Sequence, residues 1–215
     1  MTAILTRQPK TIGEQRVTLL GITWQGYQDI LRALPDNRSS RLTFDNGVLE
    51  IAVPLQIHEF SGRLIELFIR ILVVELGLKI KTLGSTTLNR EDLDRGAEPD
   101  NAYYIQNYSK VIGKTIDLAQ DPPPDLIVEV DISNTDIDKN RLYASMGVPE
   151  FWRFDGNILQ ILTLHNSDYT EVSHSPTFDL IEKEDLYRFL EQARIDEVDA
   201  EIDFRAWVRG KRSNV

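Results

Sequence analysis

The stretch that decides the fold runs from residue 122 to residue 155 and reads PPPDLIVEVDISNTDIDKNRLYASMGVPEFWRFD. Its first apolar segment, 125–132, predicts a strand, because aliphatic and β-branched residues dominate it between turn signals. Residues 136–146 predict a helix that Gly147 ends, and residues 150–154 predict a second strand. This order of elements indicates an α/β chain.

The strand predicted at 125–132 carries acids on one face and aliphatic residues on the other. Side chains alternate along a strand, so Asp125, Glu129 and Asp131 share a face with Ile127. Buried carboxylates at this spacing repel one another and are costly unless they are paired or bound to a metal. The alternative is a solvated acidic face, as on an antiparallel sheet with one side in water. The strand by itself leaves both interpretations open.

The helix predicted at 136–146 places Lys139 and Tyr143 four residues apart, and therefore on one face. Leu142 and Met146 have the same spacing, and we assign them to the core. A helix that directly follows an acidic strand can direct its lysine back towards the end of that strand. The alternatives are an exposed surface lysine and a half-buried tyrosine whose hydroxyl has found a partner.

The rest of the chain predicts further elements around this segment. Thr23 predicts the N-cap of a helix at 24–34, and Asp45-Asn46-Gly47 predicts a β-hairpin turn between strands at 42–44 and 48–53. A broad apolar face predicts the longest helix at 56–76, which Gly77 ends. The remaining expectations are strands at 16–20, 78–83, 86–88, 97–105, 158–164 and 169–175, a loop at 106–121, and C-terminal helices at 183–193 and 199–209. We expect all strands in one central sheet.

Length and composition restrict the class of protein. A chain of 215 residues with 41% hydrophobic content can bury a core without disulfides, so we expect one domain over 1–215, with a weakly ordered arm at 1–22. The absence of cysteine excludes disulfides and thiolate metal sites, and it suits a cytoplasmic location. We expect no signal peptide and no membrane span, because the longest apolar run, 64–78, contains Glu66, Arg70 and Glu75.

The formal net charge of −10 argues against binding nucleic acid through bulk electrostatics, which depends on Lys and Arg contacts to phosphates. It does not exclude a nuclease, because a site that collects carboxylates for divalent metals itself contributes negative charge.

Several motifs together resemble one known family. They are HEFSGRLI at 58–65, Glu98-Pro99-Asp100, the segment at 122–155, and NILQILTL at 157–164. The chain closely resembles the Uma-two family of the PD-(D/E)XK nuclease superfamily over residues 42 to about 175. The resemblance implies an α/β (α+β) fold with a restriction-endonuclease-like core. In that core a mixed central β-sheet is flanked by helices, here with an N-terminal β-hairpin and C-terminal helices.

The resemblance also implies a catalytic site. Asp100 and Glu129 match the two motif acids, which bind Mg²⁺ or Mn²⁺. Asp131 stands where the usual motif has its lysine, and Lys139 matches a variant in which the next helix supplies that lysine. Asp131 is then either a further metal ligand or a partner of Lys139 and Arg141.

Three supporting residues complete the expected site. Tyr143 would hydrogen-bond a carboxylate or phosphate, and Glu66 is a candidate outer acid, with a plain surface residue as the alternative. His58 matches the family at the start of the long helix.

The function implied is a metal-dependent endonuclease that hydrolyses phosphodiester bonds in DNA. We expect a homodimer, because two strands of a duplex need two sites. The alternatives are a catalytically inactive nuclease-fold protein for binding or assembly, and a metal-dependent hydrolase of a small phosphodiester, which the acidic charge tolerates better.

Overall fold

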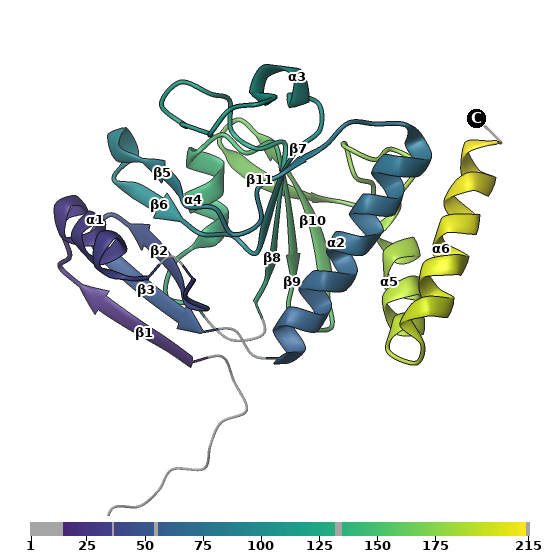
Figure 1. Ribbon diagram of the computed structural model, residues 1–215, viewed down its shortest axis with the longest axis horizontal. Coiled ribbons are helices and arrows are strands. Elements are labelled where there is room, and N and C mark those ends of the chain that lie inside the picture. Colours follow the sequence, from purple (N-terminus) through teal and green to yellow (C-terminus); the bar gives the residue numbers. More distant parts are fainter. Residues whose placement is uncertain (1–14, 36, 54–55, 132–134, 214–215) are drawn as a thin grey trace, which may run out of the picture.

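The computed structural model describes residues 15–35, 37–53, 56–131 and 135–213, without the side chains of residues 56–59. The N-terminal half forms a five-stranded antiparallel sheet (Figure 1). In spatial order its strands are β1 (Gln15–Leu20), β3 (Val48–Val53), β2 (Arg41–Asp45), β6 (Arg95–Ala97) and β5 (Leu88–Arg90). Helix α1 (Trp24–Ala33) packs on this sheet through Tyr27, which stacks on Phe44 of β2.

Local sequence signals explain this first unit. The side chain of Thr23 accepts a hydrogen bond from the backbone nitrogen of Gly26 at 3.1 Å and caps α1, as predicted. Asn46 and Gly47 join β2 to β3 with positive φ angles of 47° and 89°, the conformation that a two-residue hairpin of type I′ requires. The predicted hairpin is therefore confirmed.

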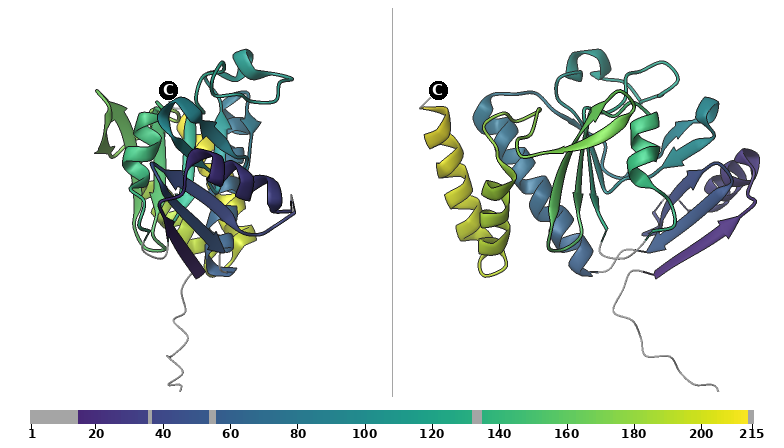
Figure 2. Two further views of the ribbon diagram at one scale, coloured as in Figure 1. Left: turned by 90° about the vertical axis from the view of Figure 1, so that its left-hand side faces the viewer. Right: turned by 180° about the vertical axis from the view of Figure 1, so that it is seen from behind.

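The second sheet has six strands and lies at the centre of the molecule (Figures 1 and 2). In spatial order they are β11 (Asp168–Val172), β10 (Leu159–His165), β9 (Glu150–Phe154), β8 (Leu126–Val130), β7 (Asn101–Tyr104) and β4 (Lys81–Thr82). β8 and β9 are parallel, because the segment with helix α4 (Lys139–Ser145) crosses over between them, and the other neighbours are antiparallel. Helices α2 (Gln56–Leu76), α5 (Lys183–Ala193) and α6 (Glu197–Arg212) cover one face, and α4 packs on the other.

Strand β8 is buried on both faces. Leu126, Val128 and Val130 belong to the core shared with α2, α5 and α6, and Ile127 packs on the side of α4. The solvated acidic face, one of the two alternatives for this strand, is wrong. Glu129 is only 3% exposed, because α4 and the first sheet cover the side that an open antiparallel sheet would leave in water.

The expectation of a single sheet is also wrong. The strand expected at 97–105 is two strands in different sheets, with β6 ending at Ala97 and β7 beginning at Asn101. Pro99 lies between them and has no N–H to continue a ladder. The strand expected at 86–88 forms instead as β5, which pairs with β6 in the first sheet.

Smaller corrections concern element boundaries. Helix α4 begins at Lys139 and not at residue 136, because the Asp138 side chain accepts a hydrogen bond from the backbone nitrogen of Arg141 and caps the helix there. The loop expected at 106–121 contains a short helix, α3 (Tyr108–Val111). Between β5 and β6 the chain forms a 3-10 segment, Glu91–Leu93. The expected strand at 78–83 is limited to β4. The start of the expected arm at 1–22, residues 1–14, lies outside the described residues, and its later part forms β1, which pairs with β3. Among the described helices none is long and apolar enough to cross a bilayer.

Candidate active site between the two sheets

Asp100 and Glu129 lie where β7 and β8 run side by side. Asn101 pairs with Val128 in this antiparallel ladder, and continuing the register places Asp100 opposite Glu129. One Asp100 oxygen accepts a hydrogen bond from the backbone nitrogen of Val130 at 2.7 Å, and the other lies 3.1 Å from Nε of Arg41 on β2. The strand ladder therefore brings together the two acids that the sequence motif predicts.

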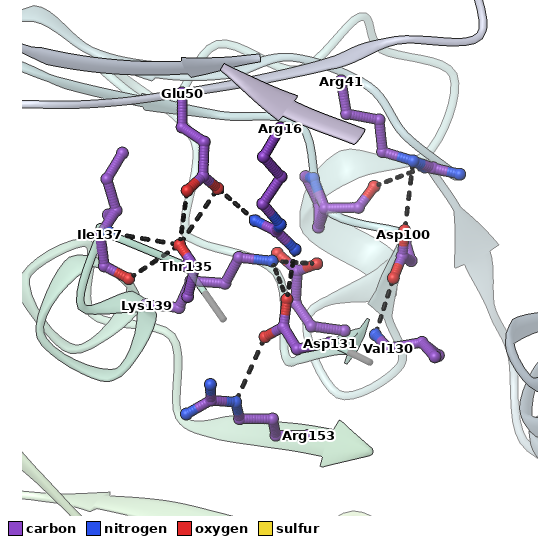
Figure 3. A network of polar contacts seen from close by, with 12 residues as sticks. Arg16, Arg41, Glu50, Asp100, Val130, Asp131, Thr135, Ile137, Lys139 and Arg153 are labelled. Atoms are coloured by element: carbon purple, nitrogen blue, oxygen red, sulfur yellow. Dashed lines mark hydrogen bonds and ion pairs between the residues drawn. The ribbon is translucent and has the colours of Figure 1, made fainter. Parts of the chain in front are cut away.

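Lys139 reaches Glu129 and the neighbouring Asp131 from the first turn of α4 (Figure 3). Its Nζ lies 2.9 Å from Oε2 of Glu129 and 2.7 Å from Oδ1 of Asp131, and its side chain is buried. Lys139 therefore lies beside the acids of the β8 segment, as expected for a lysine that the next helix supplies. The alternative of an exposed helix lysine is wrong.

Asp131 is surrounded by cations from three elements. Besides Lys139, Arg16 of β1 lies 3.3 Å from Oδ1, and Arg153 of β9 lies 3.2 Å from Oδ2 (Figure 3). The expected pairing with Lys139 occurs, but the pairing with Arg141 is wrong. Arg141 points to the first sheet and lies 2.8 Å from Oδ2 of Asp45.

Tyr143 stands one turn after Lys139 on α4, as their shared face predicts. Its hydroxyl donates a hydrogen bond to Oε1 of Glu129, and its ring packs edge-on against Phe151. Burial, followed by the charge of Glu129, raises the pKa of Tyr143 well above its ordinary value. Tyr143 is therefore a neutral donor that fixes the orientation of the Glu129 carboxylate.

Burial and charge act against each other on the three central groups. Burial raises the pKa of Glu129 to about 7, although the charge of Lys139 opposes the rise. Burial also favours the neutral form of Asp131, but Lys139 and Arg153 outweigh it and leave the pKa of Asp131 below its ordinary value. Burial lowers the pKa of Lys139, and the carboxylates of Glu129, Asp131 and Asp100 overcome this effect and raise it. Lys139 is therefore protonated at neutral pH.

Glu50 of β3 also lies at the candidate site, although its sequence context does not indicate this. It is 2% exposed and accepts hydrogen bonds from the Thr135 hydroxyl at 2.9 and 3.0 Å, from the backbone nitrogen of Asp136 at 3.1 Å, and from Arg16. These contacts tie the segment before α4 to the first sheet (Figure 3). The available signal was an acid within the otherwise apolar strand VLEIAV, and nothing in the sequence shows which surface that strand faces.

Two cavities lie at these groups. The smaller, of about 10 Å³, is lined by residues that include Asp100, Glu129 and Lys139, and it has room for about one water. The larger, of about 240 Å³, shares Asp100 with the first and has Glu66 of α2 in its wall. Glu66 is half-buried and lies at the edge of the site. His58 falls in the first turn of α2, and its side chain is outside what the structure describes.

The donor set fits a hard divalent cation, because Mg²⁺ is usually held by one or two carboxylates together with waters and substrate phosphate oxygens. Asp100 and Glu129 provide such a pair on one cavity. Among the described residues, no group of three His, Cys, Asp or Glu side chains stands ready to hold a metal. Asp131, the expected third ligand, contacts Lys139, Arg16 and Arg153 instead.

The fold is a restriction-endonuclease-like α/β fold, with a mixed central sheet flanked by helices. Its candidate site has an acid pair on adjacent strands and a lysine from the next helix. Residues 24–193 match the family model Uma2, described as "Putative restriction endonuclease", so the chain belongs to that family. A crystal structure from Anabaena variabilis, of "a putative nuclease belonging to DUF820", has the same fold. The TM-score is 0.51 at 14% identity, over 78% of this chain and 98% of that one. A search of curated proteins found no match.

Proposed function

We propose that this protein is a metal-dependent endonuclease that hydrolyses phosphodiester bonds in DNA. The observation that carries the proposal is the meeting of Asp100, Glu129 and Lys139 on one cavity between the two sheets. Membership of a restriction-endonuclease family supports the same reaction class. The strongly negative net charge restricts DNA contacts to local basic groups, of which Arg16, Arg41 and Arg153 already lie at the site.

Asp100 and Glu129 would hold Mg²⁺ or Mn²⁺ through carboxylate oxygens, with Asp131 as a further ligand only if it leaves its cations. When bound, such an ion lowers the pKa of a coordinated water and neutralises charge on the phosphate. Asp131 acts in the proposal mainly by holding the ammonium group of Lys139 in place, since its Oδ1 lies 2.7 Å from that nitrogen.

Lys139 provides the fixed positive charge of the site. Its charge is desolvated, and a preorganised charge in such a place stabilises negative charge that develops on the phosphoryl group far better than it would in water. Tyr143 keeps Glu129 oriented from the other side of the carboxylate. The side chains of α4 and β8 therefore supply orientation and electrostatic stabilisation.

Cleavage of supercoiled plasmid and of single-stranded DNA, with Mg²⁺ or Mn²⁺, tests the proposal. Asp100→Asn and Glu129→Gln keep the size of each side chain, and we expect each to lower the rate by about 100-fold or more. Asp92→Asn is the matched control, because Asp92 is an exposed acid paired with Arg90 outside the site. Equal cleavage by all three variants and the parent, or no cleavage by any of them, would refute the proposal.

The same proteins separate the alternatives. Calorimetric binding of Mg²⁺ that disappears in Asp100→Asn, without cleavage of any substrate, would favour a binding protein that has kept the fold. Hydrolysis of a small phosphodiester such as bis(p-nitrophenyl) phosphate, but not of DNA, would favour a small-molecule hydrolase. Light scattering in solution tests the homodimer, which the proposal requires for cutting both strands of a duplex.

A further inference from the structure

A polar cavity adjoins the candidate active site. Its volume of about 240 Å³ lies between α2, the loop after β4 and the start of β7. Arg41 and Asp100 line both this cavity and the small one that contains Glu129 and Lys139. A substrate that reaches the acids therefore has a continuous polar surface on which to extend.

Donor groups dominate one side of this cavity. Arg63 is exposed on α2 and makes no ion pair with another described side chain. The Ser85 hydroxyl is exposed at the rim, and the Thr82 hydroxyl oxygen is shielded from solvent without a hydrogen-bond partner among the described residues.

The cavity also contains free space beside Gly62 and a carboxylate that can accept hydrogen bonds. Gly62 forms part of the wall next to Arg63, and a Cβ atom there would have only Val130 within 4 Å, at 3.9 Å. Glu66, one turn after Gly62 on the same helix, adds a carboxylate. A purely anionic ligand would be repelled by Glu66 and Asp100, whereas a ligand with a phosphate at one end and N–H or O–H donors at the other suits both kinds of group.

We propose that this cavity binds one nucleotide unit of the substrate strand, next to the phosphodiester that is cleaved. Its phosphate would contact Arg63 and the hydroxyl of Ser85, because guanidinium and hydroxyl groups are the usual phosphate donors in nucleic-acid complexes. A donor group of the base or sugar would contact Glu66. This inference rests on the proposed function, since it takes the scissile phosphate to lie at Asp100.

Calorimetry with thymidine 3′,5′-bisphosphate in the presence of EDTA tests the subsite without any cleavage. We expect the parent protein to bind it and Arg63→Gln to bind about tenfold more weakly, a loss typical of one charged hydrogen bond. Arg70→Gln is the matched control, because Arg70 is an exposed arginine two turns along the same helix and outside the cavity. Equal losses in both variants, or no binding by the parent, would overturn the proposal.

A second comparison distinguishes a nucleotide subsite from a simple anion site. In Glu66→Gln, inorganic phosphate should bind more tightly, while the bisphosphate should gain less or become weaker. An equal gain for both ligands would show an anion site only and would overturn the nucleotide assignment.

Cleavage kinetics separate this inference from the proposed function. If the protein cuts DNA, Arg63→Gln should raise KM about tenfold with kcat retained, and an unchanged KM would refute the subsite while leaving the nuclease intact. Bisphosphate binding that depends on Arg63 in a protein without nuclease activity would refute the nuclease and keep the nucleotide site.

Discussion

The ammonium nitrogen of Lys139 lies 2.9 Å from Oε2 of Glu129, at a place where both side chains are almost completely shielded from water. Taking either charge out of water is costly. The attraction between the two charges offsets this desolvation cost only because each group has further partners. Asp131 contacts the same lysine, and Tyr143 contacts the same glutamate. The stability of the site therefore depends on the complete group.

Lys139→Met should destabilise the protein, because it leaves the carboxylates of Glu129 and Asp131 buried without their shared cation. Removing one partner of a buried ion pair costs about 3–5 kcal/mol. Urea unfolding at pH 8 measures the loss in the free energy of unfolding. The double variant Lys139→Met/Glu129→Gln should lose less than the single variant, and a single variant as stable as the parent would show that Lys139 does not compensate these acids.

Glu50→Gln should loosen the segment that leads into α4. Glu50 accepts hydrogen bonds from Thr135 and from the backbone of Asp136, and weakening such buried charged hydrogen bonds costs about 1–3 kcal/mol. Hydrogen exchange should become faster at residues 135–142 while the core of α2 stays protected. Glu171→Gln, at an exposed acid of β11, is the control and should leave exchange in that segment unchanged. Unchanged exchange in Glu50→Gln would show that the first sheet does not hold this segment.

Glu150 should make stability fall as the pH rises. Burial raises the pKa of Glu150 above its ordinary value of 4.5, against the hydrogen bonds from Thr177, Ser175 and Trp152. A carboxyl with a raised pKa binds its proton more tightly in the folded state, so its contribution is complete below the ordinary pKa and is lost as the pH rises through the folded pKa. The stability of the parent relative to Glu150→Gln should therefore decrease as the pH rises above the ordinary pKa of 4.5. Thermal unfolding of both proteins at each pH measures this stability difference. A stability advantage of the parent that increases with pH would contradict the burial effect.

Gly96→Ala should disturb the contact between α1 and the first sheet. A Cβ atom at residue 96 would lie 2.6 Å from Oδ1 of Asn89 and closer still to the Tyr27 hydroxyl, which donates to that oxygen at 3.0 Å. Overpacking of this kind costs about 1–3 kcal/mol. Gly210→Ala in α6 is the opposite case, because nothing lies within 4 Å of its added methyl group. It should stabilise by about 0.5–1 kcal/mol, and chemical unfolding of both variants tests whether their effects have opposite signs.

Local signals in the sequence were enough for most helices and strands. The turn at Asn46-Gly47, the cap at Thr23 and the apolar face of α2 depend on neighbouring residues, and each forms as expected. The division into two sheets was not predictable in this way. It depends on β2 pairing with β6, two strands far apart in the chain, and no local pattern records that choice.

In the candidate site, too, some residues could be predicted from the sequence and others could not. Asp100, Glu129 and Lys139 could be named from sequence, because the family resemblance rests on the order of its motifs along the chain. Glu50, Arg16 and Arg41 could not, since they come from the first sheet and line the same cavity as the acids only when the two sheets pack. The sequence by itself determined which acids and which lysine come together. Only the tertiary structure decided that they are buried and that arginines from another sheet share their charge, because burial and ion pairing are properties of contacts between distant segments.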